Sequence, residues 1–122
     1  MPRTDPKQQA CPIARGLEVV GDKWTLLVIR DLNRGHSKFA DLLTSLAGIS
    51  PSVLSDRLQH LELDGVVRTS YYSSHPPRAE YLLTDKGLAL IPVLRALSEW
   101  GDEWVAHAHA PRAPLAAAVV EA

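Results

Sequence analysis

The tripeptide Ile49-Ser50-Pro51 gives the clearest helix start in the chain. The hydroxyl of Ser50 can accept from the first free backbone N–H groups of a helix, and Pro51 fits the first turn, where its missing N–H would have no partner. This helix should end near Asp64-Gly65, where a β-prone run over residues 66–72 begins. A sharply started helix is therefore followed at once by a strand.

The run over residues 66–72 predicts the first strand of a hairpin. Residues 73–77, Ser-Ser-His-Pro-Pro, predict a turn, and residues 78–83 predict a second, antiparallel strand. Thr84 or Asp85 should then cap one long final helix. The apolar positions of this helix form two stripes, more than one core contact requires, which indicates that it covers a second surface. They are Leu88, Ile91, Val93, Leu94, Leu97, Trp100 and Trp104.

Two helices are predicted near the start of the chain. Pro12 fits the first turn of a helix that ends near Val20. Asp22 can cap a second helix over residues 23–33, which should be largely buried and should place Trp24 in the core.

A third helix is expected to be amphipathic, with Ser37 as its cap and Gly48 as its terminator. Outside the regular elements, residues 1–10 should form a flexible arm and residues 105–122 a disordered tail. Residues 11–104 are therefore expected to form one domain.

The length and composition of the chain are those of an ordinary globular domain, with 122 residues, of which 46% are hydrophobic and 22% charged. No apolar run approaches the roughly 20 residues of a membrane-spanning helix, and the polar N-terminus lacks the apolar stretch of a secretory signal, so we expect a cytoplasmic protein. A single cysteine excludes an internal disulfide and a multi-thiolate metal site. We predict no metal, cofactor or catalytic site and no enzymatic activity.

The order of the predicted elements is that of a winged helix-turn-helix, an α+β fold that is mainly α. In this fold the third and fourth helices form the helix-turn-helix, the hairpin forms a two-stranded wing, and the fourth helix, here residues 50–64, enters the major groove of DNA. The net charge of −1 gives no sign of such a partner, but residues 1–38 carry seven basic and four acidic side chains. The positive excess is therefore local, and double-stranded DNA is the partner that the fold predicts.

Five short motifs occur in an order that resembles the HxlR-type winged helix-turn-helix regulators, over about residues 10–104. The motifs are Cys11-Pro12, Gly21-Asp22-Lys23-Trp24, Gly48-Ile49-Ser50, Leu61-Glu62 with Gly65, and Glu80-Tyr81 with Leu83-Thr84. The resemblance implies a bacterial or archaeal transcription factor, a homodimer joined through its first and last helices, and a palindromic operator. Two positions depart from the family, because Ser52 stands where a basic or longer polar residue is common and Asp22 replaces the second glycine of the usual pair.

Eleven residues are predicted to contact DNA, most of them on the fourth helix, where short polar side chains permit a close approach to base edges. They are Arg34, Lys38, Ser50, Pro51, Ser52, Ser55, Asp56, Arg57, Gln59, His75 and Arg78.

The cationic members of this set have a second interpretation. Arg57 lies at the edge of the leucine stripe and could donate to a phosphate or a guanine, or form a surface ion pair with a neighbour such as Asp56 or Glu62. Arg78 follows the wing tip and could reach a phosphate or the minor groove. Arg34 and Lys38 could contact the DNA backbone or be solvated charges.

Five apolar residues on the first and last helices are predicted to form a dimer interface. They are Leu17, Val93, Leu97, Trp100 and Trp104. The resemblance implies dimerisation through these helices, and large aromatic side chains suit such packing. The two tryptophans could instead line a small-molecule pocket between the subunits.

Cys11 is the residue with a candidate chemical role. It precedes a helix and lies close to Arg15, so its thiolate would be stabilised by a positive electrostatic potential. Some HxlR-type regulators use a cysteine at this place to sense oxidants or electrophiles, so the resemblance implies a redox switch. Because the chain has no second cysteine, oxidation would join Cys11 of two subunits or form a mixed disulfide or adduct with a small molecule. The alternative is a small capping residue without a regulatory role.

Two functions are compatible with the sequence. The first is a DNA-binding transcriptional regulator that acts as a homodimer on a palindromic operator. The second is a ligand-sensing or protein-interaction module that kept the winged fold without sequence-specific DNA binding. It is supported by the six basic and ten acidic side chains over residues 39–122.

Overall fold

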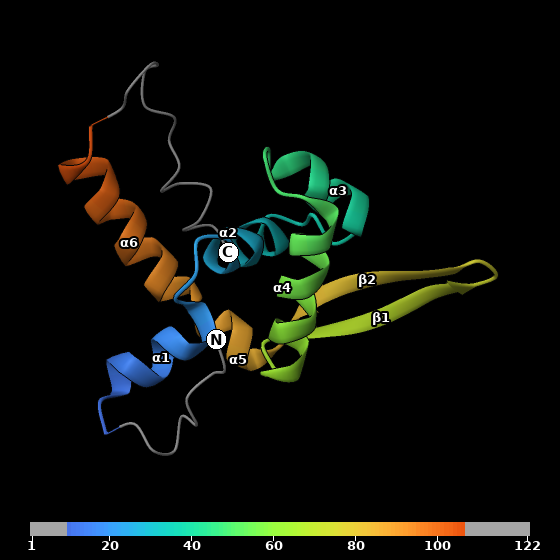
Figure 1. The fold of residues 1–122 in the computed structure, drawn as a ribbon, viewed down its shortest axis with the longest axis horizontal. Coiled ribbons are helices and arrows are strands. Elements are labelled where there is room, and N and C mark those ends of the chain that lie inside the picture. Colours follow the sequence, from blue (N-terminus) through green and yellow to red (C-terminus); the bar gives the residue numbers. More distant parts are fainter. Residues whose placement is uncertain (1–9, 107–122) are drawn as a thin grey trace.

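The computed structural model describes residues 10–106, which form six helices and one two-stranded antiparallel sheet (Figure 1). The elements are α1 (Pro12–Val20), α2 (Thr25–Asn33), α3 (Phe39–Ser45), α4 (Pro51–Leu63), β1 (Val67–Ser74), β2 (Pro77–Leu83), α5 (Asp85–Leu88) and α6 (Ile91–Trp104). This order confirms the predicted mainly helical α+β fold with a two-stranded wing. The predicted arm over residues 1–10 and the predicted tail over residues 105–122 lie almost wholly outside the described residues.

The hydrophobic core lies where α2, α3 and α4 meet the base of the hairpin and the start of α6. Helix α2 buries Val28 and Ile29 completely, as its pattern predicted, and Trp24 is half-buried against the same core. The buried apolar side chains are Val28, Ile29, Leu32, Leu42, Leu46, Ile49, Leu54, Leu58, Leu61, Val66, Val67, Ile91 and Leu94. Helix α4, which carries most of the predicted DNA contacts, is therefore anchored by its leucine stripe.

Two of the predicted helix starts depend on the expected side chains. The hydroxyl of Ser50 accepts a hydrogen bond from the backbone N–H of Val53 at 3.2 Å. Asp22 Oδ1 accepts from the N–H groups of Trp24 at 2.9 Å and Thr25 at 3.0 Å. Residues 23 and 24 form a turn, so α2 begins at Thr25, two residues later than predicted. Both residues satisfy N–H groups that have no partner inside the helix.

The prediction that Ser37 caps α3 is wrong. Helix α3 begins after Lys38, and no side chain caps it. The backbone carbonyl of Ser37 instead accepts a hydrogen bond from the N–H of Tyr81 at 2.8 Å. A long-range pairing with the wing therefore determines the conformation of Ser37.

The final helix is not continuous, so the prediction of one long helix from Thr84 is also wrong. Thr84 does cap a helix, because its hydroxyl accepts from the N–H of Gly87 at 3.2 Å, but that helix ends at Leu88. Helix α6 begins at Ile91, with Pro92 in its first turn. Proline has no N–H to donate to the carbonyl of Leu88, and its ring would clash with that carbonyl, so one helix cannot continue through this point.

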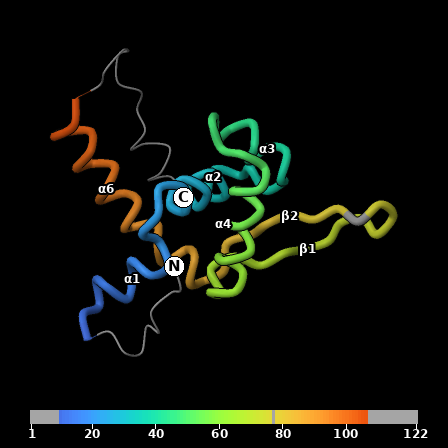
Figure 2. The backbone as a smooth tube through the Cα atoms, viewed as in Figure 1, coloured from blue at the N-terminus to red at the C-terminus, as the bar shows by residue number. Residues whose placement is uncertain are grey.

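The hairpin projects away from the helices (Figures 1 and 2). Its strands pair antiparallel, starting with Val67 opposite Leu83, and the register shifts beside Tyr72, which is the extra residue of a β-bulge. Ser73 and Ser74 also pair with β2, so the turn is shorter than predicted.

Helices α1 and α6 lie on the side of the molecule opposite to the wing (Figure 1). Helix α6 packs against α2 and buries Ile91 and Leu94, whereas α1 has no buried residue. None of the helices in residues 10–106 combines the length and the apolar character that crossing a membrane requires.

Candidate nucleic-acid interface

Helix α4 presents a polar face to solvent. Its buried stripe consists of Leu54, Leu58 and Leu61, so the residues between them face outwards. The predicted contact residues on this face are all exposed, namely Ser50, Pro51, Ser52, Ser55, Asp56 and Gln59. Short side chains allow the helix to approach base edges, and the N-terminus of a helix favours phosphate.

A hollow of about 320 Å³ lies between α4 and the wing. Helix α4 contributes Ser55, Gln59 and Glu62, and the wing contributes Thr69 and Tyr71. The hydroxyl of Thr69 donates to Glu62 Oε2 at 2.7 Å, which joins the helix to β1. The hollow therefore brings hydrogen-bonding side chains of the helix and the wing around one space.

Tyr81 also lines this hollow. Burial raises the pKa of its phenol, and the nearby Glu62 carboxylate and Tyr71 phenol raise it further. The Tyr81 hydroxyl therefore keeps its proton and remains a hydrogen-bond donor at neutral pH.

Two wing tyrosines join this candidate interface, although the sequence interpretation missed both. Tyr71 is 72% exposed and Tyr72 is 48% exposed. The ammonium of Lys38 lies 5.0 Å from the centroid of the Tyr72 ring, within the range of a cation–π contact. Neighbouring residues of a regular strand point to opposite faces, and only one face of the hairpin can pack against the helices. Two adjacent tyrosines, Tyr71 and Tyr72, therefore indicate that at least one aromatic ring faces solvent.

The two contacts predicted on the wing lie apart from the hollow. His75 follows β1 and Arg78 is near the start of β2, so both are at the tip of the hairpin, and both are exposed. Figure 1 shows this tip extending beyond α4. The structure therefore separates the wing-tip residues from those on α4.

Arg34 points toward the protein interior. Asp31 of α2 is fully buried and pairs with Arg30 at 3.0 Å and with Arg34 at 3.5 Å. The Arg34 side chain is consequently only 24% exposed. Its contact with DNA stays a prediction, and the observed partner is a carboxylate of the same chain.

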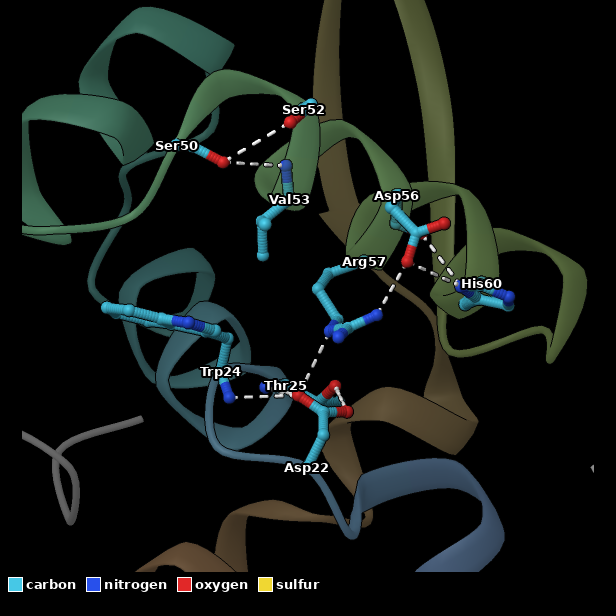
Figure 3. A network of polar contacts seen from close by, with 9 residues as sticks. All are labelled: Asp22, Trp24, Thr25, Ser50, Ser52, Val53, Asp56, Arg57 and His60. Atoms are coloured by element: carbon cyan, nitrogen blue, oxygen red, sulfur yellow. Dashed lines mark hydrogen bonds and ion pairs between the residues drawn. The ribbon is translucent and has the colours of Figure 1, made fainter. Parts of the chain in front are cut away.

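Arg57 belongs to a network that joins α4 to the turn between α1 and α2 (Figure 3). Its Nε donates to Asp22 Oδ1 at 3.1 Å, and its Nη1 donates to Asp56 Oδ2. Asp56 Oδ2 also lies 3.3 Å from Nδ1 of His60. The sequence left two interpretations of Arg57, a contact with DNA and a surface ion pair. The structure shows an ion pair with Asp56. It adds Asp22, a partner 35 residues away that the sequence could not indicate.

The Asp22 carboxylate binds both the start of α2 and, through Arg57, helix α4. Burial by itself would raise the pKa of its carboxyl group, but other contacts outweigh this effect. Hydrogen bonds from the Thr25 hydroxyl and from the N–H groups of Trp24 and Thr25, together with the Arg57 guanidinium, lower that pKa below the usual 3.8. Asp22 is therefore ionised at neutral pH, while it caps α2 and binds α4.

The second candidate surface is apolar and lies on α1 and α6. The five residues predicted for the dimer interface are between 46% and 69% exposed, namely Leu17, Val93, Leu97, Trp100 and Trp104. A groove of about 460 Å³ lies between α1 and the α5–α6 segment and is lined mainly by apolar side chains. Exposed apolar surface of this kind is typical of an interaction site.

Cys11 is exposed and precedes α1 as its N-cap residue. Its side chain makes no capping hydrogen bond. Arg15, one turn away, donates from Nη1 to the carbonyl of Ala10 at 3.2 Å. The thiol is therefore accessible, and the geometry does not support helix capping as its role.

Metal ligation does not explain the charged clusters. Over residues 10–106, no group of three or more His, Cys, Asp or Glu side chains is placed to hold a metal ion. The clusters around Asp22 and Asp31 consist of carboxylates paired with guanidinium groups, an arrangement that holds protein segments together.

Comparisons with known proteins agree with this architecture. Residues 19–109 match the HxlR-like helix-turn-helix family. The chain is 37% identical over 100 residues to the HTH-type transcriptional regulator YvaP of Bacillus subtilis, which covers 81% of this chain and 93% of YvaP. It resembles the crystal structure of PA1607, a candidate transcription factor, with a TM-score of 0.80 and 36% identity over 90% of this chain and 76% of PA1607. The redox regulator HypR in its reduced form matches with a TM-score of 0.72 and 31% identity over 76% of this chain and 92% of HypR.

Proposed function

Since the chain belongs to the HxlR-like helix-turn-helix family of DNA-binding transcriptional regulators, we propose that it acts as a homodimer on a palindromic operator. The observation that carries this proposal is the exposed polar face of α4, which shares a hollow with the wing. In the proposed complex, α4 enters the major groove and the wing follows the duplex backbone.

The proposed base contacts come from Ser52, Ser55 and Gln59 of α4. Serine side chains are short and can read few base edges, so sequence-dependent DNA shape should supply part of the specificity. Asp56 would accept from a cytosine amino group. Ser50 and Pro51 place the first turn of α4 close to a phosphate.

The proposed phosphate contacts come from Lys38, His75 and Arg78, which are all exposed. Lys38 lies between α3 and the wing, and the other two residues are at the wing tip. Because these cations are few, the salt dependence of binding should be shallower than that of strongly basic DNA-binding proteins.

Dimerisation is proposed through the apolar surface of α1 and α6. An exposed apolar surface is unfavourable in water, and pairing two copies would cover it. This surface lies opposite to the wing, so pairing leaves both copies of α4 and the wing accessible (Figure 1). Two copies of α4 would then engage half-sites about 34 Å apart, or one helical turn.

Cys11 is the proposed oxidant-responsive residue. Its exposure and the absence of a capping bond support this role, as does the likeness to HypR, whose structure is known in reduced and oxidised forms. Oxidation by diamide would remove one proton and one electron from each of two Cys11 thiols and form one S–S bond between two chains. With a small thiol as the second partner, the product would be a mixed disulfide.

A second candidate function is a ligand-sensing or protein-interaction module without sequence-specific DNA binding. Two observations favour it, the acidic excess over residues 39–122 and the ion pairs that engage Arg34 and Arg57 inside the chain. In this case the apolar groove beside α1 would hold a ligand or partner.

Selection of binding sites from random double-stranded DNA with the reduced chain tests the proposal. An enriched palindrome is expected, whereas the absence of any enriched sequence would favour the interaction module. Diamide should then weaken binding of the wild type but not of Cys11→Ser. An equal response in both proteins would remove the role of Cys11 and leave the DNA-binding proposal intact.

A further inference from the structure

We propose that Arg57 is a positioning residue, and that its ion pair with Asp22 fixes the orientation of α4 relative to α1. This inference rests on the proposed function, because it concerns how two copies of α4 are held for a palindromic operator. It assigns to Arg57 an indirect role in DNA binding in place of a direct contact with DNA.

The orientation of the Arg57 side chain is the first argument. Two of its nitrogens are already directed at carboxylates, Nε at Asp22 and Nη1 at Asp56. The side chain is 28% exposed, whereas Ser55 and Gln59 on the same helix are exposed to solvent. Figure 3 shows Arg57 extending from α4 toward Asp22, in the turn that precedes α2.

The rigidity of the partner is the second argument. Asp22 accepts from the N–H groups of Trp24 and Thr25 and from the Thr25 hydroxyl, so its carboxylate has a defined position. Thr25 itself is buried at the start of α2. An ion pair with a fixed carboxylate is more favourable than one with a mobile surface side chain, because less conformational entropy is lost in forming it. Such a pair therefore restrains Arg57 more effectively.

The turn between α1 and α2 is the third argument. The N–H of Gly21 donates to the carbonyl of Leu17 at 2.9 Å, which closes α1 directly before Asp22. A Cβ atom at Gly21 would lie 2.4 Å from that carbonyl oxygen, so only glycine permits this close turn. Asp22 is thereby held next to the end of α1, and α1 carries part of the proposed dimer surface.

These contacts connect the dimer surface to α4 through a short path. Residues 17–22 link α1 to the Asp22 carboxylate, and the carboxylate binds the middle of α4 through Arg57. Two copies of α4 on one operator must keep a fixed separation and tilt. The pair of Asp22 with Arg57 therefore sets how strictly the dimer requires one spacing between half-sites.

The test uses the full chain and the variants Asp22→Asn, Arg57→Gln and their combination. Asparagine keeps an oxygen that can accept from the N–H groups at the start of α2. It removes the charge and replaces Oδ2, the acceptor of the Thr25 hydroxyl, by an amino group. Asp85→Asn, in the first turn of α5, is the control, because it changes the net charge by the same amount away from α4. Dissociation constants are measured on the selected palindrome, on a palindrome lengthened by one base pair and at several salt concentrations, and unfolding is followed separately.

Each single variant should weaken binding to the palindrome by about fivefold, the combined effect of losing one partly exposed ion pair in each of the two subunits. The double variant should bind no more weakly than either single one. The preference for the correct spacing should fall in all three, while the slope of log K against log salt stays that of the wild type. Asp85→Asn should bind like the wild type.

A different pattern would overturn the inference. If Arg57 contacts a phosphate, Arg57→Gln lowers the salt slope by about two per dimer, and Asp22→Asn leaves binding unchanged or tightens it. Additive losses, or an unchanged spacing preference, would likewise contradict the positioning role. If the wild type itself selects no DNA sequence, the proposed function fails. Failure of the positioning role is recognised separately, because it appears only as a difference between the wild type and the variants.

Discussion

The ammonium of Lys38 lies 5.0 Å from the centroid of the Tyr72 ring, so the residue before α3 contacts the bulged position of the wing. The hydrogen bond from the N–H of Tyr81 to the carbonyl of Ser37 joins the same two segments at 2.8 Å. The helix-turn-helix and the wing are therefore connected beside the proposed DNA-binding face.

Replacement of Lys38 by methionine keeps the length of the side chain and removes its charge. If Lys38 contacts a phosphate in each subunit, the slope of log K against log salt should decrease by about two per dimer. Fluorescence anisotropy on the selected palindrome at several salt concentrations measures this change.

Tyr72→Leu is the matched variant, because it removes the aromatic face without removing a charge. It should weaken binding by a few-fold, since a cation–π contact contributes about 0.5–1 kcal/mol at exposed sites, and it should leave the salt slope unchanged. An unchanged slope in Lys38→Met would show that Lys38 does not contact a phosphate.

Replacement of Gly87 by alanine should destabilise the fold. A Cβ atom at this position would lie 2.4 Å from the carbonyl oxygen of Val66 and 3.0 Å from a methyl group of Leu83. Backbone atoms cannot yield easily, so we expect a loss of about 1–3 kcal/mol in the free energy of unfolding. Urea denaturation measures this loss.

Gly101→Ala is the control for that experiment. Gly101 lies inside α6, and a Cβ atom there would meet nothing within 4 Å. Alanine should therefore stabilise α6 by about 0.5–1 kcal/mol, because glycine is the poorer helix former. Equal losses in both variants would contradict the packing described at Gly87.

Replacement of Leu97 by glutamate should convert the proposed dimer into monomers. Leu97 is 51% exposed on the α6 face proposed for dimerisation, and burying a charge among apolar side chains is costly. We expect the dimer dissociation constant to rise by about tenfold or more, and sedimentation analysis would detect it. The control is Leu63→Glu, because Leu63 is 77% exposed at the end of α4 and outside this face. Dissociation in both variants, or in neither, would contradict the proposed interface.

The contribution of the Asp22 carboxylate to stability should depend on pH. Its pKa is lower in the folded chain than the usual 3.8, so the ionised form stabilises the fold, and this stabilisation is lost as the pH falls through the lowered value. Asp22→Asn should therefore be less stable than the wild type at neutral pH, and the difference should disappear well below pH 3.8. Urea denaturation across this range provides the measurement, and a difference that persists in acid would contradict the assignment.

Local signals in the sequence predicted most of the fold. Ser50 and Asp22 act on N–H groups two or three residues away, and the apolar spacing of residues 54–61 depends only on helical periodicity. Such features are visible without the tertiary structure. The break between α5 and α6 had a local signal as well, because Pro92 is incompatible with a continuous helix, but the strong apolar pattern of residues 88–104 hid it.

Long-range pairing explains what the sequence could not predict. The partner of Ser37 is Tyr81 of the wing, and the partner of Arg57 is Asp22, 35 residues away. Neither pairing leaves a periodic pattern, because each depends on how the helices and the hairpin pack. The candidate contacts on α4 could be predicted as exposed. Asp31 and Arg34 are three residues apart, a spacing that brings side chains together on a helix, whereas the complete burial of Asp31 required the structure.

The central claim is that two copies of the chain recognise one palindrome. Its most direct test is the stoichiometry and affinity of the reduced wild type on the selected palindrome, on a duplex with one half-site and on a scrambled duplex. We predict two chains per palindrome, bound far more tightly than the half-site or the scrambled sequence. One chain per duplex with equal affinity for all three would contradict the account.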